Sequence, residues 1–83
     1  MGNWTEPILW RWIHPEKRRW YLVWVGLDLF GDRVLIRAWG SLDSRRGGEK
    51  REIPASEAEI DKRLHAIARQ RRRRGYVVCG GSP

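Results

Sequence analysis

The feature that most constrains the fold of this chain is a change in hydrophobic period at Pro54. Before it, apolar residues come in short runs, 8–14, 20–26 and 33–40, that are rich in aromatic and β-branched side chains and typical of strands. After it, apolar residues recur three or four positions apart, as on one face of a helix. The residues at this helical spacing are Ala58, Ile60, Leu64, Ile67 and Ala68. The strands and the helix are therefore expected to form separate layers.

The run 20–26 carries bulky side chains at alternate positions on both faces, which predicts a central strand. The turn at 15–18 joins it to the first run as a hairpin, and Gly31-Asp32 supplies the next turn. We expect a loop over 41–48. The charged segment 49–53 is then a short edge strand, and 76–79 could add a fifth.

Both ends of the helix carry recognisable signals. Ser56, with Glu59 three residues later, forms a capping box, and Gly75 follows the last expected turn. The sequence predicts an α+β fold: a twisted antiparallel sheet of four to five strands with one long helix packed on one face.

A chain of 83 residues permits one domain, with a core over about 8–79 and frayed termini at 1–7 and 80–83. The lone Cys79 excludes an intrachain disulfide and fits a reducing compartment. The N-terminus lacks a signal-peptide pattern, so a cytoplasmic protein is expected, associated with the nucleoid if it binds DNA. The longest apolar stretch, 21–27, is too short to span a bilayer.

The charge is strongly positive. Lys and Arg total 17 against 10 Asp and Glu, which gives a net charge of +7, and only three of the 17 are lysine. An arginine side chain can hold two phosphate oxygens at once. DNA, RNA, an anionic membrane face or an acidic protein would each suit this charge.

The densest group of cations lies at the end of the predicted helix. It can clamp phosphates, or it can match the helix dipole, although that second role needs fewer arginines. The helix-end cations are Arg69, Arg71, Arg72, Arg73 and Arg74.

Trp39 is the last aromatic residue of the third run. It is either a platform that stacks on a sugar or base, or a core residue.

The expected loop and edge strand hold a second group of cations that could meet a phosphate backbone or simply protect the sheet edge. Its members are Arg45, Arg46, Lys50 and Arg51.

Tyr76 either stacks on a nucleic acid or caps the helix by packing against it. The other tryptophans of the runs, Trp10, Trp12, Trp20 and Trp24, are expected in the core or on a sheet face.

No pattern in the sequence indicates catalysis. His14 and His65 are isolated, and neither has a cysteine or carboxylate at metal-binding spacing. No phosphate-binding or dinucleotide-binding glycine motif is present. A basic ribonuclease would need a paired general acid and base, which two distant histidines do not supply. We therefore expect no enzyme activity and no cofactor.

Three segments resemble the WGR domain family. They are Leu27-Asp28-Leu29-Phe30-Gly31, then Leu35-Ile36-Arg37-Ala38-Trp39-Gly40, and finally Arg73-Arg74-Gly75-Tyr76 after the helix. The family is named for a Trp-Gly-Arg tripeptide and occurs in DNA-break-activated ADP-ribosyl transferases and in bacterial proteins. The spacing agrees from about Trp10 to Val78, but Ser41 stands where the family has Arg.

The resemblance implies that Trp39 packs near the terminal sugar of a DNA end. The contacts of the missing arginine could pass to Arg37, Arg45 or Arg46. We therefore predict a module that binds nucleic acid, DNA first and RNA as the alternative, mainly through the phosphate backbone and at ends or breaks. The chain has one Asn and one Gln, too few for extensive base reading. The alternative is a docking module that binds an acidic protein or a second copy of itself.

Overall fold

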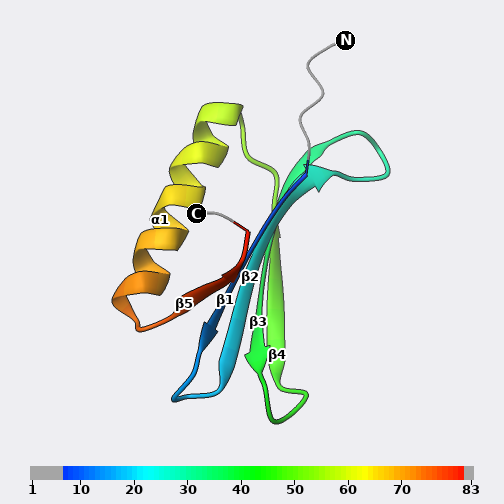
Figure 1. Ribbon diagram of the computed structural model, residues 1–83. Helices are drawn as coiled ribbons and strands as arrows, with labels where there is room; N and C mark the ends of the chain where they lie inside the picture. Colours follow the sequence, from blue (N-terminus) through cyan, green and yellow to red (C-terminus); the bar gives the residue numbers. More distant parts are fainter. Residues whose placement is uncertain (1–6, 82–83) are drawn as a thin grey trace.

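The computed structural model describes residues 7–81, and its architecture is the predicted α+β fold (Figure 1). Five antiparallel strands form one sheet in the order β4-β3-β2-β1-β5, with β2 in the middle as expected. A single helix covers one face of this sheet (Figure 1). The elements are β1 (Ile8–His14), β2 (Arg19–Leu27), β3 (Arg33–Ser41), β4 (Gly47–Glu52), α1 (Glu57–Arg73) and β5 (Val77–Gly80).

The core lies between the helix and the covered face of the sheet. Side chains alternate between faces along a strand, so every second residue of β1, β2 and β3 points at α1. The helix contributes apolar residues that recur three and four positions apart and so lie on one of its faces. The buried members from the sheet include Trp12, Val23, Val25 and Leu35, and those from the helix are Ile60, Leu64 and Ile67.

Both predicted helix ends are present. The Ser56 hydroxyl accepts a hydrogen bond from the Glu59 backbone N–H at 3.1 Å, while the Glu59 carboxylate pairs with Arg63 instead of returning to Ser56. At the other end Gly75 has φ +87°, and the Tyr76 N–H donates to the Arg71 carbonyl at 3.0 Å. These contacts form a Schellman motif, which directs the chain back toward the sheet and into β5.

The expected loop over 41–48 is shorter than predicted. Ser41 is the last residue of β3, and β4 begins at Gly47 rather than at residue 49. Both strand positions suit glycine, because a Cβ at Gly47 would lie 2.4 Å from the Trp39 carbonyl oxygen, and one at Gly48 would lie 3.0 Å from the Trp39 ring. Close approach to β3 thus accounts for two glycines in a strand despite the low strand preference of glycine.

Smaller differences occur at the element ends. Ile53 follows β4 instead of closing it, and Ala58, expected on the packed helix face, is exposed. Of the termini expected to fray, residues 1–6 and 82–83 lie outside the described residues. Gly80 closes β5.

The tryptophans divide between the two faces as alternation predicts. Trp10 and Trp12 point toward the helix, and their rings meet edge-on at 6.2 Å. Trp20 and Trp24 lie on the other face, which no helix covers (Figure 1). There each ring lies over a glycine: a Cβ would approach the Trp20 ring to 2.7 Å at Gly40, and the Trp24 ring to 2.4 Å at Gly26.

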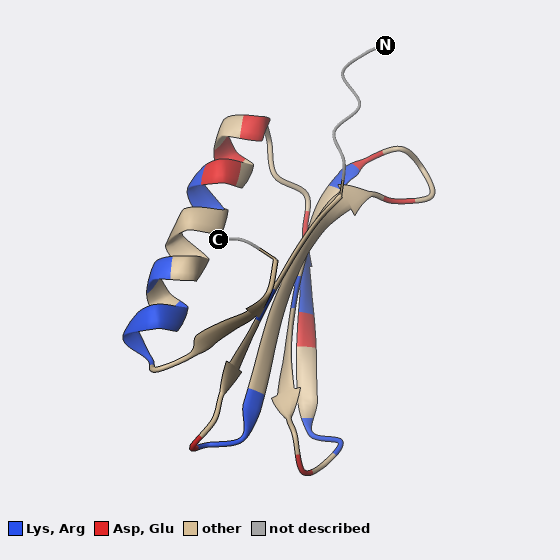
Figure 2. Ribbon diagram, viewed as in Figure 1, with Lys and Arg blue, Asp and Glu red and all other residues tan. Residues whose placement is uncertain are grey.

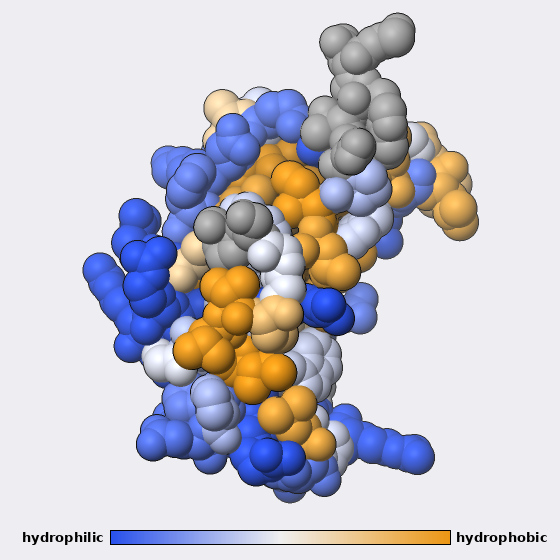
Figure 3. Space-filling model, in the orientation of Figure 1, coloured by the Kyte–Doolittle hydropathy of each residue, from blue (hydrophilic) through white to orange (hydrophobic). Residues whose placement is uncertain are grey.

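The turn between β2 and β3 is organised by Asp28. Its carboxylate accepts the backbone N–H groups of Phe30 and Asp32, both at 2.9 Å, and the bond from Asp32 is the main reason that the pKa of Asp28 is lowered. The turn holds Leu29 and Phe30 almost fully in solvent, at 99% and 88% exposure. Figure 3 shows this apolar tip projecting beyond the sheet.

Candidate functional site

A groove of about 830 Å³ lies where the C-terminal end of α1 meets the ends of β2 and β3. Three separate segments supply its walls. The hairpin between β1 and β2 contributes Lys17, Arg19 and Tyr21, and the end of β3 with the following loop contributes Trp39 and Arg46. The helix end supplies Arg71, Arg74 and Tyr76.

The floor of the groove is aromatic. Tyr21 and Trp39 are cross-strand neighbours in the pairing of β2 with β3, and their rings stack at 6.3 Å with an angle of 18° between planes. Trp39 is 40% exposed, and Gly48 opposite it on β4 leaves space for the indole. Trp39 is thus neither a core residue nor a free side chain. Its ring is fixed on one side by Tyr21 and remains partly accessible.

Arg71 is the most unusual residue of the groove. It is only 8% exposed, and its guanidinium carbon lies 4.1 Å from the centre of the Tyr21 ring and 4.8 Å from that of Tyr76. A Schellman motif commonly places an apolar contact at this point, and here the contact is a cation between two rings. The ring contacts hold the guanidinium at the floor of the groove.

The guanidinium of Arg71 has almost no hydrogen-bonding partner within residues 7–81. Its Nε is buried and unpaired, and one terminal nitrogen reaches the Gln70 side chain at 3.5 Å. Buried arginines are normally paired with an anion or an acceptor. The charge of Arg71 is therefore fixed in place and unneutralised by the described part of the chain.

All the charged residues that line the groove are positive. Five cations, Lys17, Arg19, Arg46, Arg71 and Arg74, line it together with no Asp or Glu. Within residues 7–81 none of the five takes part in an ion pair, although Arg18, next to the groove, pairs with Asp43 at 2.9 Å. Figure 2 shows Lys and Arg gathered on the last turns of α1 and acidic residues on its first turns.

The structure brings five of the residues predicted for the binding site together in the groove. Trp39, Arg46, Arg71, Arg74 and Tyr76 all line the groove. Arg45 lies beside it in a second hollow that Trp39 also borders. Three helix cations lie elsewhere, because the buried stripe of α1 ends in Arg71 and positions on other sides of the helix face solvent. They are Arg69, Arg72 and Arg73, all exposed.

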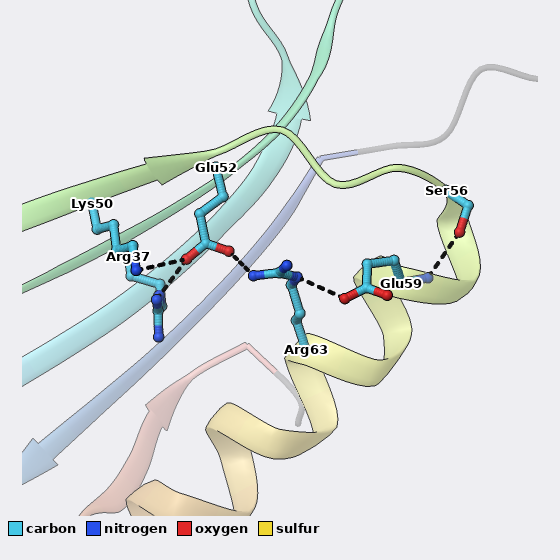
Figure 4. A network of polar contacts seen from close by, with 6 residues as sticks. All are labelled: Arg37, Lys50, Glu52, Ser56, Glu59 and Arg63. Atoms are coloured by element: carbon cyan, nitrogen blue, oxygen red, sulfur yellow. Dashed lines mark hydrogen bonds and ion pairs between the residues drawn. The ribbon is translucent and has the colours of Figure 1, made fainter.

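The cations of β3 and β4 that the sequence predicted as phosphate contacts form ion pairs with carboxylates. Glu52 accepts from Arg37 at 2.5 Å, lies 3.8 Å from the Lys50 amine, and also pairs with Arg63 of the helix (Figure 4). Arg51 is on the opposite face of the sheet and pairs with Asp28 at 2.8 Å. These residues tie β4 to its neighbours and do not line the groove.

Sequence reasoning missed Lys17, Arg19 and Tyr21. Strand alternation places Arg19 and Tyr21 on one face, but only the pairing register puts Tyr21 opposite Trp39. The helix end comes to the same place because α1 crosses the sheet, which a linear sequence does not reveal. A tyrosine two residues from an arginine at the start of a strand was the available signal.

The histidines have structural surroundings. His14 is buried, meets the Tyr76 ring edge-on at 5.3 Å, and accepts a hydrogen bond from the Lys17 N–H at 3.2 Å. His14 thereby supports two groove residues from behind. Residues 7–81 contain no cluster of three His, Cys, Asp or Glu side chains that could hold a metal ion. The described helix is not long and apolar enough to cross a membrane.

No protein-family model, curated protein or solved structure matches the chain.

Proposed function

We propose that this protein binds nucleic acid, DNA in the first instance, in the groove between the helix end and the sheet. The observation that carries the proposal is Arg71, a buried guanidinium between two tyrosine rings with its Nε unpaired among the described residues. A buried cation without a counter-charge is unfavourable by itself, so its presence here favours an anionic ligand.

Two recognition elements adjoin in the groove. Trp39, stacked on Tyr21, presents a fixed aromatic surface, and stacking of a base on such a ring is worth about 1–3 kcal/mol. The cations around it meet phosphates, which dominate the affinity of proteins for nucleic acids. Arg71 and Arg74 come from the helix, and Arg19 comes from β2.

This arrangement favours strand ends. Inside a continuous duplex both faces of every base are already stacked on neighbours, so Trp39 can stack only where a base or sugar is terminal or unpaired. The resemblance to the WGR family supports the same reading, since it places the equivalent tryptophan against the terminal sugar of a DNA end. Here Ser41 stands where the family has arginine, and of the three residues predicted to take over its contacts, Arg46 is the one that lines the groove.

The salt dependence follows from the number of cations. Neutralisation of about five phosphates by the five groove cations gives a slope of roughly −4.5 for log affinity against log salt on duplex DNA. A fourfold rise in salt concentration then weakens binding about 500-fold.

The proposal is tested by fluorescence anisotropy with two labelled DNAs, a blunt hairpin and an end-free circle, each at two salt concentrations. Preferential binding of the hairpin, weakened in Trp39→Ala, is expected. Equal binding of both DNAs would reject recognition of ends. Absence of binding at low salt would reject nucleic acid as the ligand and favour an acidic protein partner.

A further inference from the structure

The face of the sheet opposite α1 is apolar where an exposed face should be polar. An antiparallel sheet packed on one side normally alternates apolar residues inward with polar residues outward. In β2, however, the outward residues are Trp20, Leu22 and Trp24, and across β3 they pair with Gly40, Ala38 and Ile36. Within residues 7–81 no helix covers this face, because α1 lies on the other side of the sheet (Figure 1), and these side chains are partly exposed.

On this face the charged residues of the paired rows lie on the outer strands β1 and β4 and not on β2 or β3. The register gives three rows across strands β1, β2, β3 and β4: Ile13–Trp20–Gly40–Gly47, then Arg11–Leu22–Ala38–Glu49, then Leu9–Trp24–Ile36–Arg51. The two central strands contribute no charge to any row. An apolar centre with charges on the rim is the usual composition of a protein interface.

The middle row is self-complementary. Arg11 on β1, the strand next to edge strand β5, and Glu49 on edge strand β4 occupy the same row, three strands apart, or roughly 14 Å. Both are exposed, and neither forms an ion pair within residues 7–81. They are too far apart to pair within one chain, but a second copy brings them together.

A twofold axis between two facing sheets brings Arg11 of one copy to Glu49 of the other. The axis runs parallel to the strands and passes midway between β2 and β3. The rotation places β1 of one copy opposite β4 of the other, so that Arg11 faces the partner's Glu49 and the reverse contact forms as well. Leu22 then faces the partner's Ala38, and Trp24 faces the partner's Ile36. Flat rings over Gly40 and Gly26 suit the about 10 Å spacing of packed sheets.

We propose that two copies of this chain associate face to face through the uncovered side of the sheet, with Arg11 and Glu49 as reciprocal ion pairs. Four overlapping strands about 4.8 Å apart, with about seven residues each, give roughly 450 Å² of projected area per copy. A surface covered with side chains buries more than its projection, so the pair reaches the ~1,000 Å² of a modest specific interface. The dimer is therefore expected to be weak and reversible.

The dimer would also duplicate the groove. Because the axis runs along the strands, both grooves lie at the same end of the dimer. The first row of the apolar face borders the groove, since Trp20, Gly40 and Gly47 are among its lining residues. The inference still does not depend on the proposed ligand, because the pairing residues Arg11 and Glu49 do not line the groove.

The test is sedimentation equilibrium of the full chain over a concentration series, with charge-reversal variants. Arg11→Glu and Glu49→Arg are each expected to weaken association about 10-fold, because each change creates two like-charge contacts in a symmetric dimer. The double variant carries both reversals and is expected to restore association. Arg69→Glu changes the charge by the same amount on the exposed side of the helix and serves as the matched control.

Thermal melts by circular dichroism verify that each variant folds, which is expected because both positions are exposed. Two results would overturn the proposal: a wild-type chain that stays monomeric at every concentration, or a double variant that associates no better than the single ones. Nucleic-acid binding, measured separately with Trp39→Ala, can fail without affecting either result.

Discussion

The Arg71→Met substitution separates ligand binding from folding at the groove. A methionine side chain keeps an unbranched apolar chain between the rings of Tyr21 and Tyr76 but removes the positive charge. The free energy of unfolding is expected to fall by no more than the cation–π part of these contacts, about 1–2 kcal/mol, because removal of an unpaired buried charge offsets some of that loss. The fold should therefore survive the change.

The effect on DNA binding is expected to be larger. A hydrogen bond to a charged group contributes about 1.5–3 kcal/mol, so the loss of one arginine–phosphate contact should weaken binding roughly 10- to 150-fold. The log–log salt slope should also become shallower by about 0.9, because one phosphate is no longer neutralised.

The assay is anisotropy of a labelled hairpin at several salt concentrations, together with thermal unfolding of the free protein. Arg69→Met is the matched control, since Arg69 has the same charge on the exposed side of the same helix. If Arg71→Met and Arg69→Met reduce affinity and slope equally, Arg71 has no privileged contact with the ligand, and the reasoning from its burial is refuted.

Four other outcomes test the fold. Ser56→Ala should lower the free energy of unfolding by about 1 kcal/mol in a denaturant titration, because the Glu59 N–H loses its acceptor; an unchanged midpoint would contradict the cap. Gly75→Ala should cost about 1–2 kcal/mol in the same assay, since φ is +87° there. Glu52→Gln should destabilise the chain, seen as a lower melting temperature at low salt, because Arg37 and Arg63 lose a shared counter-ion. Asp28 has a pKa below its usual 3.8, so its ionised form stabilises the fold above that pH, and the contribution is lost as the pH falls through the lowered value. The melting temperature of the wild type should exceed that of Asp28→Asn at neutral pH, and the gap should close in acid; a gap independent of pH would refute this.

Local signals were sufficient for most of the fold. The period of apolar residues predicted β1 and the helix, and Ser56 and Gly75 marked the helix ends because capping depends on residues close in sequence. Gly47 and Gly48 were wrongly expected in a loop. Gly47 lies close to the Trp39 carbonyl oxygen and Gly48 close to the Trp39 ring, and such contacts between strands are not a local property of the sequence.

The site was harder to predict than the fold. The arginine-rich helix end and Trp39 were visible in the sequence, yet Tyr21 joins them only through the register of β2 with β3. The charge count also could not separate Arg71, which has no counter-ion among the described residues, from Arg37, which pairs with Glu52. Which cations remain available to a ligand depends on tertiary ion pairs.

The central claim is that the groove binds a nucleic-acid end through Trp39 and the surrounding cations. The most direct test is the affinity of the wild type and Trp39→Ala for a blunt DNA hairpin and for an end-free circle of the same length, at one low salt concentration. The account predicts that the wild type prefers the hairpin and that Trp39→Ala abolishes the preference, with affinity for the hairpin reduced about 5- to 150-fold, as expected for the loss of one stacked base. A wild type that binds both DNAs equally, or a Trp39→Ala variant that binds as the wild type does, would contradict it.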